Sequence, residues 1–160
     1  MAFETDYLKD LRNRFDRAFA GAINAIGQLS EEQIWHRSSS QSNSVGIIVQ
    51  HLTGNLSQWV LDALGGREYK RNRPLEFEDS KKKSKSQLMK DFEQLGKDVE
   101  DVISKLSPDL LLSPRHIQDT DQTVLTALQQ CITHVNLHTG QILYIAKMLL
   151  NEKYMGASRH

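Results

Sequence analysis

The sequence predicts an all-α protein that folds as a four-helix bundle. Apolar residues recur at alternating spacings of three and four along four long stretches, which is the pattern of helices with one buried face. Polar connections of varied length separate these stretches. A chain of 160 residues suits one domain with one hydrophobic core. We therefore expect a single four-helix-bundle domain over residues 1–160.

The first half of the chain contains two of the predicted long helices. The first is expected over about residues 4–28, with charged side chains on its outer face. Ser30 and Gln33 fit a capping box that begins a short helical turn. Asn43 or Ser44 can cap the second long helix, which should end at the glycine pair 65–66.

A long connection is predicted between the second and third helices. It covers about residues 67–83, and Pro74 should exclude a helix through its centre. The third helix is expected over about residues 85–106, a loop over residues 113–121 and the last helix over about residues 122–151. The last helix is apolar around much of its circumference, so it should be central to the bundle or shared with another subunit.

Charge and composition exclude several classes of protein. Lys and Arg number 20, and Asp and Glu also number 20, so no overall field favours nucleic acid or an anionic membrane. The apolar run at about residues 142–150 is too short to span a bilayer, and the N-terminal residues lack the pattern of a signal peptide. The one cysteine, Cys131, cannot form an internal disulfide. We therefore expect a cytoplasmic protein that binds neither nucleic acid nor membranes.

Three histidines are the candidate ligands of a metal ion. His134 and His138 are four residues apart on the last predicted helix, so their rings should lie one turn apart on the same side. His51 lies on the second predicted helix. If His51 reaches the same height in the bundle, three neutral imidazoles can hold one divalent ion and leave a coordination position open, which is typical of catalytic sites. The functional interpretation depends on whether these three side chains meet.

Other chemical sites are not favoured. No Glu follows His134 in the arrangement of zinc proteases, and the chain lacks the paired Glu-x-x-His motifs of ferritin-like di-iron proteins. Cys131 falls on the core stripe of the last helix, which favours an inert, packed thiol over a nucleophile. His36 and His116 lie in predicted loops and His160 in the C-terminal tail, and we expect none of them to bind metal.

The last helix also carries features away from its main apolar stripe. Gly140 costs about 1 kcal/mol relative to alanine in a helix interior, so we expect close approach of another backbone or a need for room beside the metal. Leu137, Tyr144 and Met148 lie on the side opposite the stripe. These apolar side chains predict a contact in a homodimer.

Several segments resemble the DinB/YfiT-like superfamily of bacterial four-helix-bundle proteins, and the match extends over nearly the whole chain. The matching segments are LSEEQIW at 29–35, SVGIIVQHL at 44–52 and HVNLHTGQI at 134–142. A narrower resemblance, to a subgroup with an Arg-Asn-Arg…Glu-Phe-Glu loop, rests on GNL at 54–56 and YKRNRPLEFE at 69–78. The resemblance implies a divalent metal, commonly zinc or nickel, bound by His51, His134 and His138.

The resemblance also implies a class of reaction. Members of the superfamily include thiol-dependent S-transferases and isomerases that use low-molecular-weight thiols such as bacillithiol or mycothiol. The leading hypothesis is therefore a metal-dependent transferase that activates a small thiol. Candidate residues that contact the substrate or support the metal ligands are Asn55, Gln141, Arg71 and Arg73. Asn55 and Gln141, each one turn after a histidine, could orient the ligands or the substrate, and the basic side chains Arg67, Lys70, Arg71 and Arg73 of the long connection could bind a carboxylate or sugar-acid portion of the thiol.

Two alternatives come from other functional classes. The chain could be a non-catalytic, dimeric helical module that binds a ligand in a stress response, with a structural metal or none. It could also be a metal-dependent hydrolase in which the ion activates water. Metal content after purification separates the first alternative from both enzymes. Dependence of turnover on a thiol separates a transferase from a hydrolase.

Overall fold

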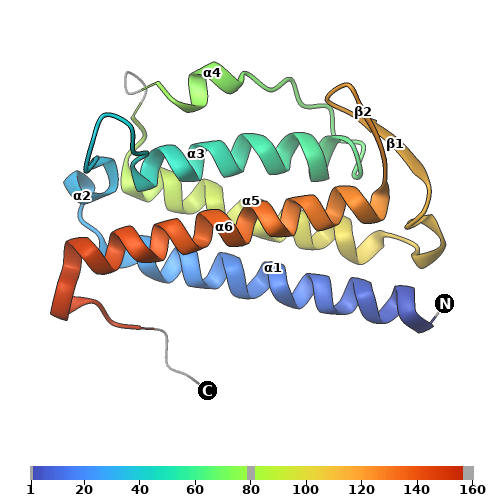
Figure 1. Ribbon diagram of the computed structural model, residues 1–160, viewed down its shortest axis with the longest axis horizontal. Coiled ribbons are helices and arrows are strands. Elements are labelled where there is room, and N and C mark those ends of the chain that lie inside the picture. The colour runs from blue at the N-terminus through green and yellow to red at the C-terminus, as the bar shows by residue number, and fades with distance from the viewer. Residues whose placement is uncertain (1, 79–81, 157–160) are drawn as a thin grey trace.

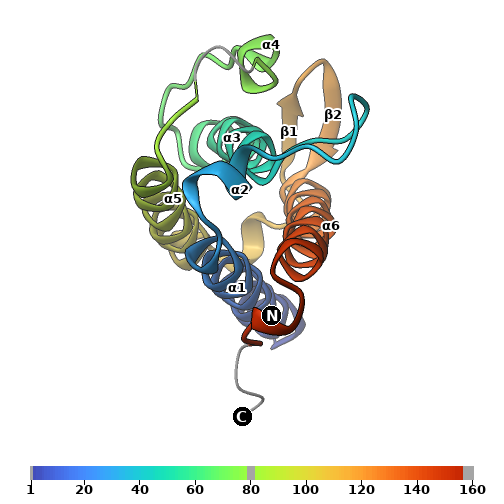
Figure 2. The same ribbon diagram turned by 90° about the vertical axis from the view of Figure 1, so that its left-hand side faces the viewer.

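The structure is a computed structural model that describes residues 2–78 and 82–156 (Figure 1). Within these residues, four long helices form the body of the protein: α1 (Ala2–Gln28), α3 (Val45–Leu56), α5 (Lys85–Lys105) and α6 (Val124–Leu150). Figure 2 shows the four helices from one end, arranged around a common interior. The predicted four-helix bundle is therefore confirmed.

Hydroxyl side chains mark the beginnings of the helices. Ser30 forms the predicted capping box at the start of the short helix α2 (Glu31–Trp35). Ser44, Ser84 and Thr123 begin α3, α5 and α6, and each accepts a hydrogen bond from the backbone N–H three residues further on. Each cap satisfies a donor that the first helical turn leaves without an intrahelical partner. These helices therefore begin where the sequence provides a hydroxyl group.

The interior of the bundle is filled by apolar side chains from all four helices. Leu11 and Ile26 of α1, Leu52 of α3, Phe92 of α5 and Leu128 of α6 are among the fully buried ones. Burial of each large apolar side chain stabilises the fold by roughly 1.5–3 kcal/mol. These contacts use the apolar faces that the sequence periodicity predicted, and they hold α3 and α6 in contact with each other.

The second long helix departs from the prediction in its last part. Regular α-helical geometry ends at Leu56, and Ser57–Asp62 is π-helical, with hydrogen bonds to carbonyls five residues back, such as that from Ala63 N–H to Gln58. The chain leaves the bundle at Gly66, whose φ of 68° is a conformation that glycine adopts readily. The helix therefore ends at Asp62, three residues before the predicted glycine pair, and it is not a uniform α-helix.

The connection between α3 and α5 contains a helical turn that the prediction excluded. The single-turn helix α4 (Arg73–Glu76) has Pro74 in its first turn. The prediction that Pro74 prevents a helix was wrong. A backbone N–H in the first turn of a helix has no intrahelical partner, so proline, which has no N–H, costs no hydrogen bond at this position. Helix α4 lies over α3 and contacts it (Figure 1). The connection thereby covers one side of the bundle.

The segment predicted as a loop at residues 113–121 contains a β-hairpin. Strand β1 (Pro114–Ile117) pairs antiparallel with β2 (Thr120–Thr123). Gln118 and Asp119 form the turn with φ values of 52° and 59°, as a tight hairpin turn requires. The prediction missed the hairpin because the usual Asn-Gly or Asp-Gly signal is absent and each strand is only four residues long. Strand β2 continues directly into α6, which begins at Val124.

The remaining elements are short. Turns of 3₁₀-helix at Pro108–Leu110 and Asn151–Lys153 follow α5 and α6. Among the residues that the structure describes, no helix combines the length and the apolar character needed to cross a membrane.

Candidate metal centre

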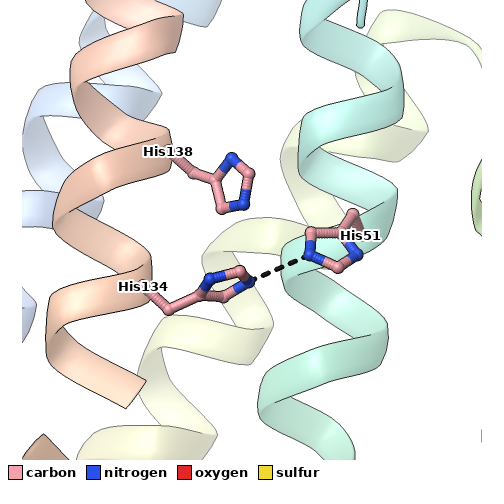
Figure 3. Close-up of side chains that lie close together, drawn as sticks. All are labelled: His51, His134 and His138. Carbon is pink, nitrogen blue, oxygen red and sulfur yellow. Dashed lines mark hydrogen bonds between the residues drawn. The ribbon is translucent and has the colours of Figure 1, made fainter. Parts of the chain in front are cut away.

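The three predicted histidines meet between two helices. Figure 3 shows His51 on α3 facing His134 and His138, which lie one turn apart on α6. The Nε2 atoms of His51 and His134 are 2.9 Å apart, and one ring nitrogen from each of the three side chains lies within 4.8 Å of the others. The ring centroids are separated by 5.0, 5.1 and 4.4 Å. The expectation that a second helix brings His51 to the His134–His138 pair is confirmed.

The other histidines lie elsewhere. His36 is exposed just beyond α2, and His116 is exposed on β1, where its Nδ1 lies 2.7 Å from Oδ1 of Asp121. Neither belongs to the group of three. His160 lies outside the described residues. The site therefore takes one side chain from α3 and two from α6.

His51 is held by a carboxylate that the sequence analysis did not assign. Its Nδ1 lies 2.9 Å from Oε2 of Glu76, the last residue of α4, and both side chains are about nine-tenths buried. An ionised carboxylate can only accept hydrogen bonds, so Nδ1 of His51 carries the hydrogen and donates it. The tautomer assigned in this way leaves the lone pair of Nε2 directed toward His134 and His138.

Arg71 fixes Glu76 in turn. Its Nε donates to Oε1 at 2.6 Å and its Nη2 donates to Oε2 at 2.8 Å, which is a bidentate pair. Burial alone would raise the pKa of Glu76, but the hydrogen bonds from Arg71 and His51 outweigh it, so the pKa of this carboxyl is lowered. Glu76 is therefore ionised at neutral pH.

Gly54 provides the space for this ion pair. It lies in the interior of α3, where a Cβ atom would stand 2.1 Å from Oε1 of Glu76 and 3.4 Å from Nε of Arg71. A side chain at this position would displace the carboxylate. The GNL segment at 54–56 and the connection are therefore in contact, because the missing side chain at Gly54 of α3 leaves room for the Glu76 side chain of α4.

The two histidines on α6 are half-buried, and one of them has a neutral hydrogen-bond partner. Nδ1 of His138 lies 2.7 Å from Oε1 of the exposed Gln141, so the amide oxygen accepts the Nδ1 hydrogen of this ring. Burial lowers the pKa of His134 to about 4 and also lowers that of His138. Both rings are therefore neutral at pH 7, which is the form that binds a metal.

The basic residues of the connection have different surroundings. The side chain of Arg71 is 6% exposed and bound to Glu76, so it does not grip a substrate. It lies instead among the groups that support His51, which was the other role suggested for it. Arg67 pairs with acidic residues of α5. Arg73 is exposed and lies over the ring of Phe77, whose centroid is 5.2 Å from that of His51. Arg73 is therefore the arginine of this group that lies beside the histidines with its charged group accessible.

The structure also shows the surroundings of three further residues singled out in the sequence, Asn55, Cys131 and Gly140. Asn55 is half-buried one turn after His51. Cys131 is buried, and burial raises the pKa of its thiol to about 12, which agrees with an inert core cysteine. A Cβ atom at Gly140 would meet nothing within 4 Å, so the expected close approach of another backbone is not found within the described chain.

The donor set fits a divalent metal ion. Zinc binds imidazole nitrogen at about 2.0–2.1 Å, and the three nitrogens are close enough to share one ion after small rotations of the side chains. Nε2 of His51 has a lone pair directed at the other rings, and its Nδ1–H is bound to a carboxylate, as is usual for a ligating histidine. An ion held by these three side chains alone would have a coordination position available to a small molecule.

Comparison with known proteins assigns the chain to a family. The family model described as "Protein of unknown function (DUF1572)" matches residues 2–158. The chain belongs to this family. No curated protein matches it.

Solved structures confirm the DinB-like fold. A DinB-like protein from Bacillus cereus superposes with a TM-score of 0.70 at 12% identity, covering 88% of this chain and 91% of its own. A DinB-like protein from Bacillus subtilis (YjoA) superposes with a TM-score of 0.70 at 13% identity, covering 93% of this chain and 96% of its own. At these identities the similarity shows the shared fold alone.

Sequence reasoning identified the three histidines and Gln141, which accepts a hydrogen bond from His138, but it missed the parts played by Glu76 and Gly54. Glu76 lies in the Arg-Asn-Arg…Glu-Phe-Glu loop, to which no chemistry was assigned, and Gly54 was noted only as part of a motif. The available signal was a glycine in the interior of a helix, one turn from a histidine, together with a loop that contains both an arginine and a glutamate. The separation of 25 residues between His51 and Glu76 hid their contact.

Proposed function

We propose that this protein binds one divalent metal ion, zinc or nickel, through His51, His134 and His138. The observation that carries the proposal is the convergence of three imidazoles from two helices, with Nε2 of His51 and Nε2 of His134 2.9 Å apart. Two of the three rings have their Nδ1 hydrogen engaged by Glu76 or Gln141, which leaves Nε2 as their donor atom.

We further propose that the protein is a metal-dependent S-transferase that uses a small thiol as co-substrate. A divalent ion with three neutral ligands keeps its full positive charge and can hold a thiol as its thiolate. The reaction forms a bond between the thiol sulfur and an electrophilic carbon, breaks the bond from that carbon to a leaving group, and releases the thiol proton to water. The chain's own cysteine does not take part because Cys131 is buried with a raised pKa.

A cavity that shares Gln141 with the surroundings of His138 supports binding of a small molecule. It has a volume of about 470 Å³ and is lined by apolar side chains such as Ile48 and Tyr144 together with polar ones such as Asn43 and Gln141. Gln141 also accepts a hydrogen bond from His138, so one residue contacts both the cavity and a proposed ligand. Arg73 is exposed beside the site and can pair with a carboxylate of the thiol.

Two measurements test the proposal in sequence. Elemental analysis of protein purified without added metal should give about one zinc or nickel per chain, and metal-free protein would reject the metal site. Turnover of a generic electrophile such as chlorodinitrobenzene is then measured with and without a panel of small thiols. Thiol-dependent turnover supports the transferase. Thiol-independent cleavage of an ester would instead support a metal-dependent hydrolase, and metal without any turnover would support a non-catalytic ligand-binding module.

We also propose that two copies associate through the outer face of α6. Leu137, Tyr144 and Met148 are 60%, 69% and 48% exposed, which is unusual for large apolar side chains close together on one helix. Tyr144 and Met148 also line the cavity, so a second copy would border the proposed substrate site. Sedimentation velocity of wild type and Tyr144→Asp tests this, with a dimer expected only for wild type. We propose no role in binding nucleic acid or membranes.

A further inference from the structure

We propose that Glu76, held by Arg71 and admitted by Gly54, is a positioning residue that fixes His51 for metal binding. The inference rests on the proposed function, in which the three histidines bind a metal. It assigns a role to the connection between α3 and α5, which carries none of the three histidines.

Glu76 is held at both its side chain and its backbone. The carboxylate accepts hydrogen bonds from Nδ1 of His51 at 2.9 Å and from Arg71 at 2.6 and 2.8 Å. The backbone carbonyl of Glu76 accepts a hydrogen bond from Nε2 of Gln50 at 3.2 Å. Gln50 precedes His51 on α3, so the same helix turn that carries the histidine also anchors the backbone of its partner. These contacts determine both the place and the direction of the carboxylate.

Two unfavourable features coincide at this point of the fold. A buried carboxylate is costly to desolvate, and Glu76 is only 8% exposed. A glycine in a helix interior lowers the stability of the helix by about 1 kcal/mol relative to alanine. At Gly54 the carboxylate of Glu76 occupies the space that a Cβ atom would take. A surface salt bridge would anchor the connection without either cost. The contact that both features permit is the one between Glu76 and His51.

The hydrogen bond has a direct effect on the ligand atom. With its Nδ1 hydrogen donated to Glu76, the imidazole of His51 keeps its Nε2 lone pair and cannot rotate without losing the bond. A carboxylate partner also makes the imidazole a stronger electron donor to a metal. Glu76 therefore acts through His51, and not by contact with the metal or a substrate.

The test compares the metal affinity of three variants with that of wild type. Glu76→Gln keeps the size of the side chain but removes its charge, and Gly54→Ala places a methyl group where the carboxylate lies. Gly140→Ala is the matched control, because it makes the same change in a helix interior where a Cβ meets nothing within 4 Å. Zinc affinity is measured by competition with a chromophoric chelator. We expect binding to weaken about 10–100-fold in Glu76→Gln and Gly54→Ala, and to stay unchanged in Gly140→Ala.

A second measurement separates positioning from a purely structural role. Nitrogen NMR of the metal-free protein reports which ring nitrogen of His51 carries the hydrogen, and we expect Nδ1 in wild type and a mixture of tautomers in Glu76→Gln. Thermal unfolding of the same metal-free samples reports stability. A variant that is less stable but keeps its zinc affinity and its tautomer would overturn the inference, as would a Glu76→Gln protein that binds zinc as tightly as wild type. Wild-type protein that binds no zinc would instead reject the proposed function itself.

Discussion

Two imidazole–carboxylate pairs in this protein have almost the same local geometry and very different surroundings. Nδ1 of His51 lies 2.9 Å from Glu76, and Nδ1 of His116 lies 2.7 Å from Asp121. The first pair is buried between α3 and α4. The second lies on the hairpin with exposed fractions of 64% and 92%. The hydrogen bond alone therefore does not indicate a metal site.

The difference lies in what surrounds each pair. The carboxylate of Glu76 is bound by Arg71, and the far nitrogen of His51 faces His134. His116 has its carboxylate partner directly across the hairpin and belongs to no group of potential metal ligands in the described residues. We expect a carboxylate to orient a histidine for metal binding only where the pair is buried and where the other ring nitrogen faces further potential ligands.

The largest expected difference between the two pairs is in metal content. Replacing His51 with alanine removes one of three ligands, and we expect bound metal to fall from about one ion per chain to near zero. Replacing His116 with alanine should leave metal content unchanged. Elemental analysis of both variants, with His134→Ala and His36→Ala as further positive and negative controls, makes the comparison. Metal retained in His51→Ala, or lost in His116→Ala, would mean that the ligands are wrongly assigned.

The second expected difference is in stability. It contrasts the buried ion pair behind His51 with an exposed ion pair of the same connection, through their arginines Arg71 and Arg67. Arg71→Ala leaves the buried carboxylate of Glu76 without its bidentate partner, and we expect metal-free protein to lose about 3–5 kcal/mol of unfolding free energy. Arg67 is 45% exposed and pairs with Asp98 and Asp101 at the surface, so Arg67→Ala should leave the unfolding midpoint nearly unchanged. Urea denaturation measures both. Equal losses in the two variants would show that burial adds nothing to the Arg71–Glu76 pair.

The long helices were predictable from the sequence because their apolar periodicity is a local property. Each of the four long helices buries the stripe that the sequence showed, and Ser30 and Ser44 cap where expected. The elements that escaped prediction are short. The hairpin turn uses Gln118 and Asp119 where glycine is usual, and α4 tolerates Pro74 because proline lies in its first turn. The π-helical end of α3 depends on hydrogen-bond register, which residue type hardly determines.

The candidate site was predictable only where its residues follow helix geometry. The spacing of His134 and His138 fixes their relation on α6. The position of His51 on the second predicted helix made it the candidate third ligand, and the resemblance to DinB/YfiT-like proteins implied the same role. Glu76 was not predictable in this way, because its contact with His51 depends on how an irregular connection folds back over α3. The burial of Arg71 and its pairing with Glu76 were not predictable for the same reason, since an arginine in a loop suggests a surface position.

Gln141 provides an intermediate case between the two carboxylate pairs. It accepts a hydrogen bond from Nδ1 of His138, as Glu76 does from His51, but it is neutral and exposed. A neutral hydrogen bond contributes about 0.5–1.5 kcal/mol, so Gln141→Ala should weaken zinc binding by at most roughly tenfold. Chelator competition measures it beside Glu76→Gln, which should lose more. If Gln141→Ala lost more zinc affinity than Glu76→Gln, the hydrogen bond to His138 on α6 would be the more important one for metal binding.

The smallest expected effect is the titration of the exposed pair. The hydrogen bond from Asp121 and its negative charge raise the pKa of His116 above its ordinary value of 6.5, because both favour the protonated ring. Since the pKa is higher in the folded state, the pair stabilises the hairpin below the unfolded pKa, and this contribution is lost as pH rises through the folded pKa. NMR titration of the His116 ring in wild type and Asp121→Asn measures the shift. We expect the pKa of His116 to fall toward 6.5 in the variant while zinc binding is unaffected, and an unchanged pKa would mean that solvent already screens the exposed pair completely.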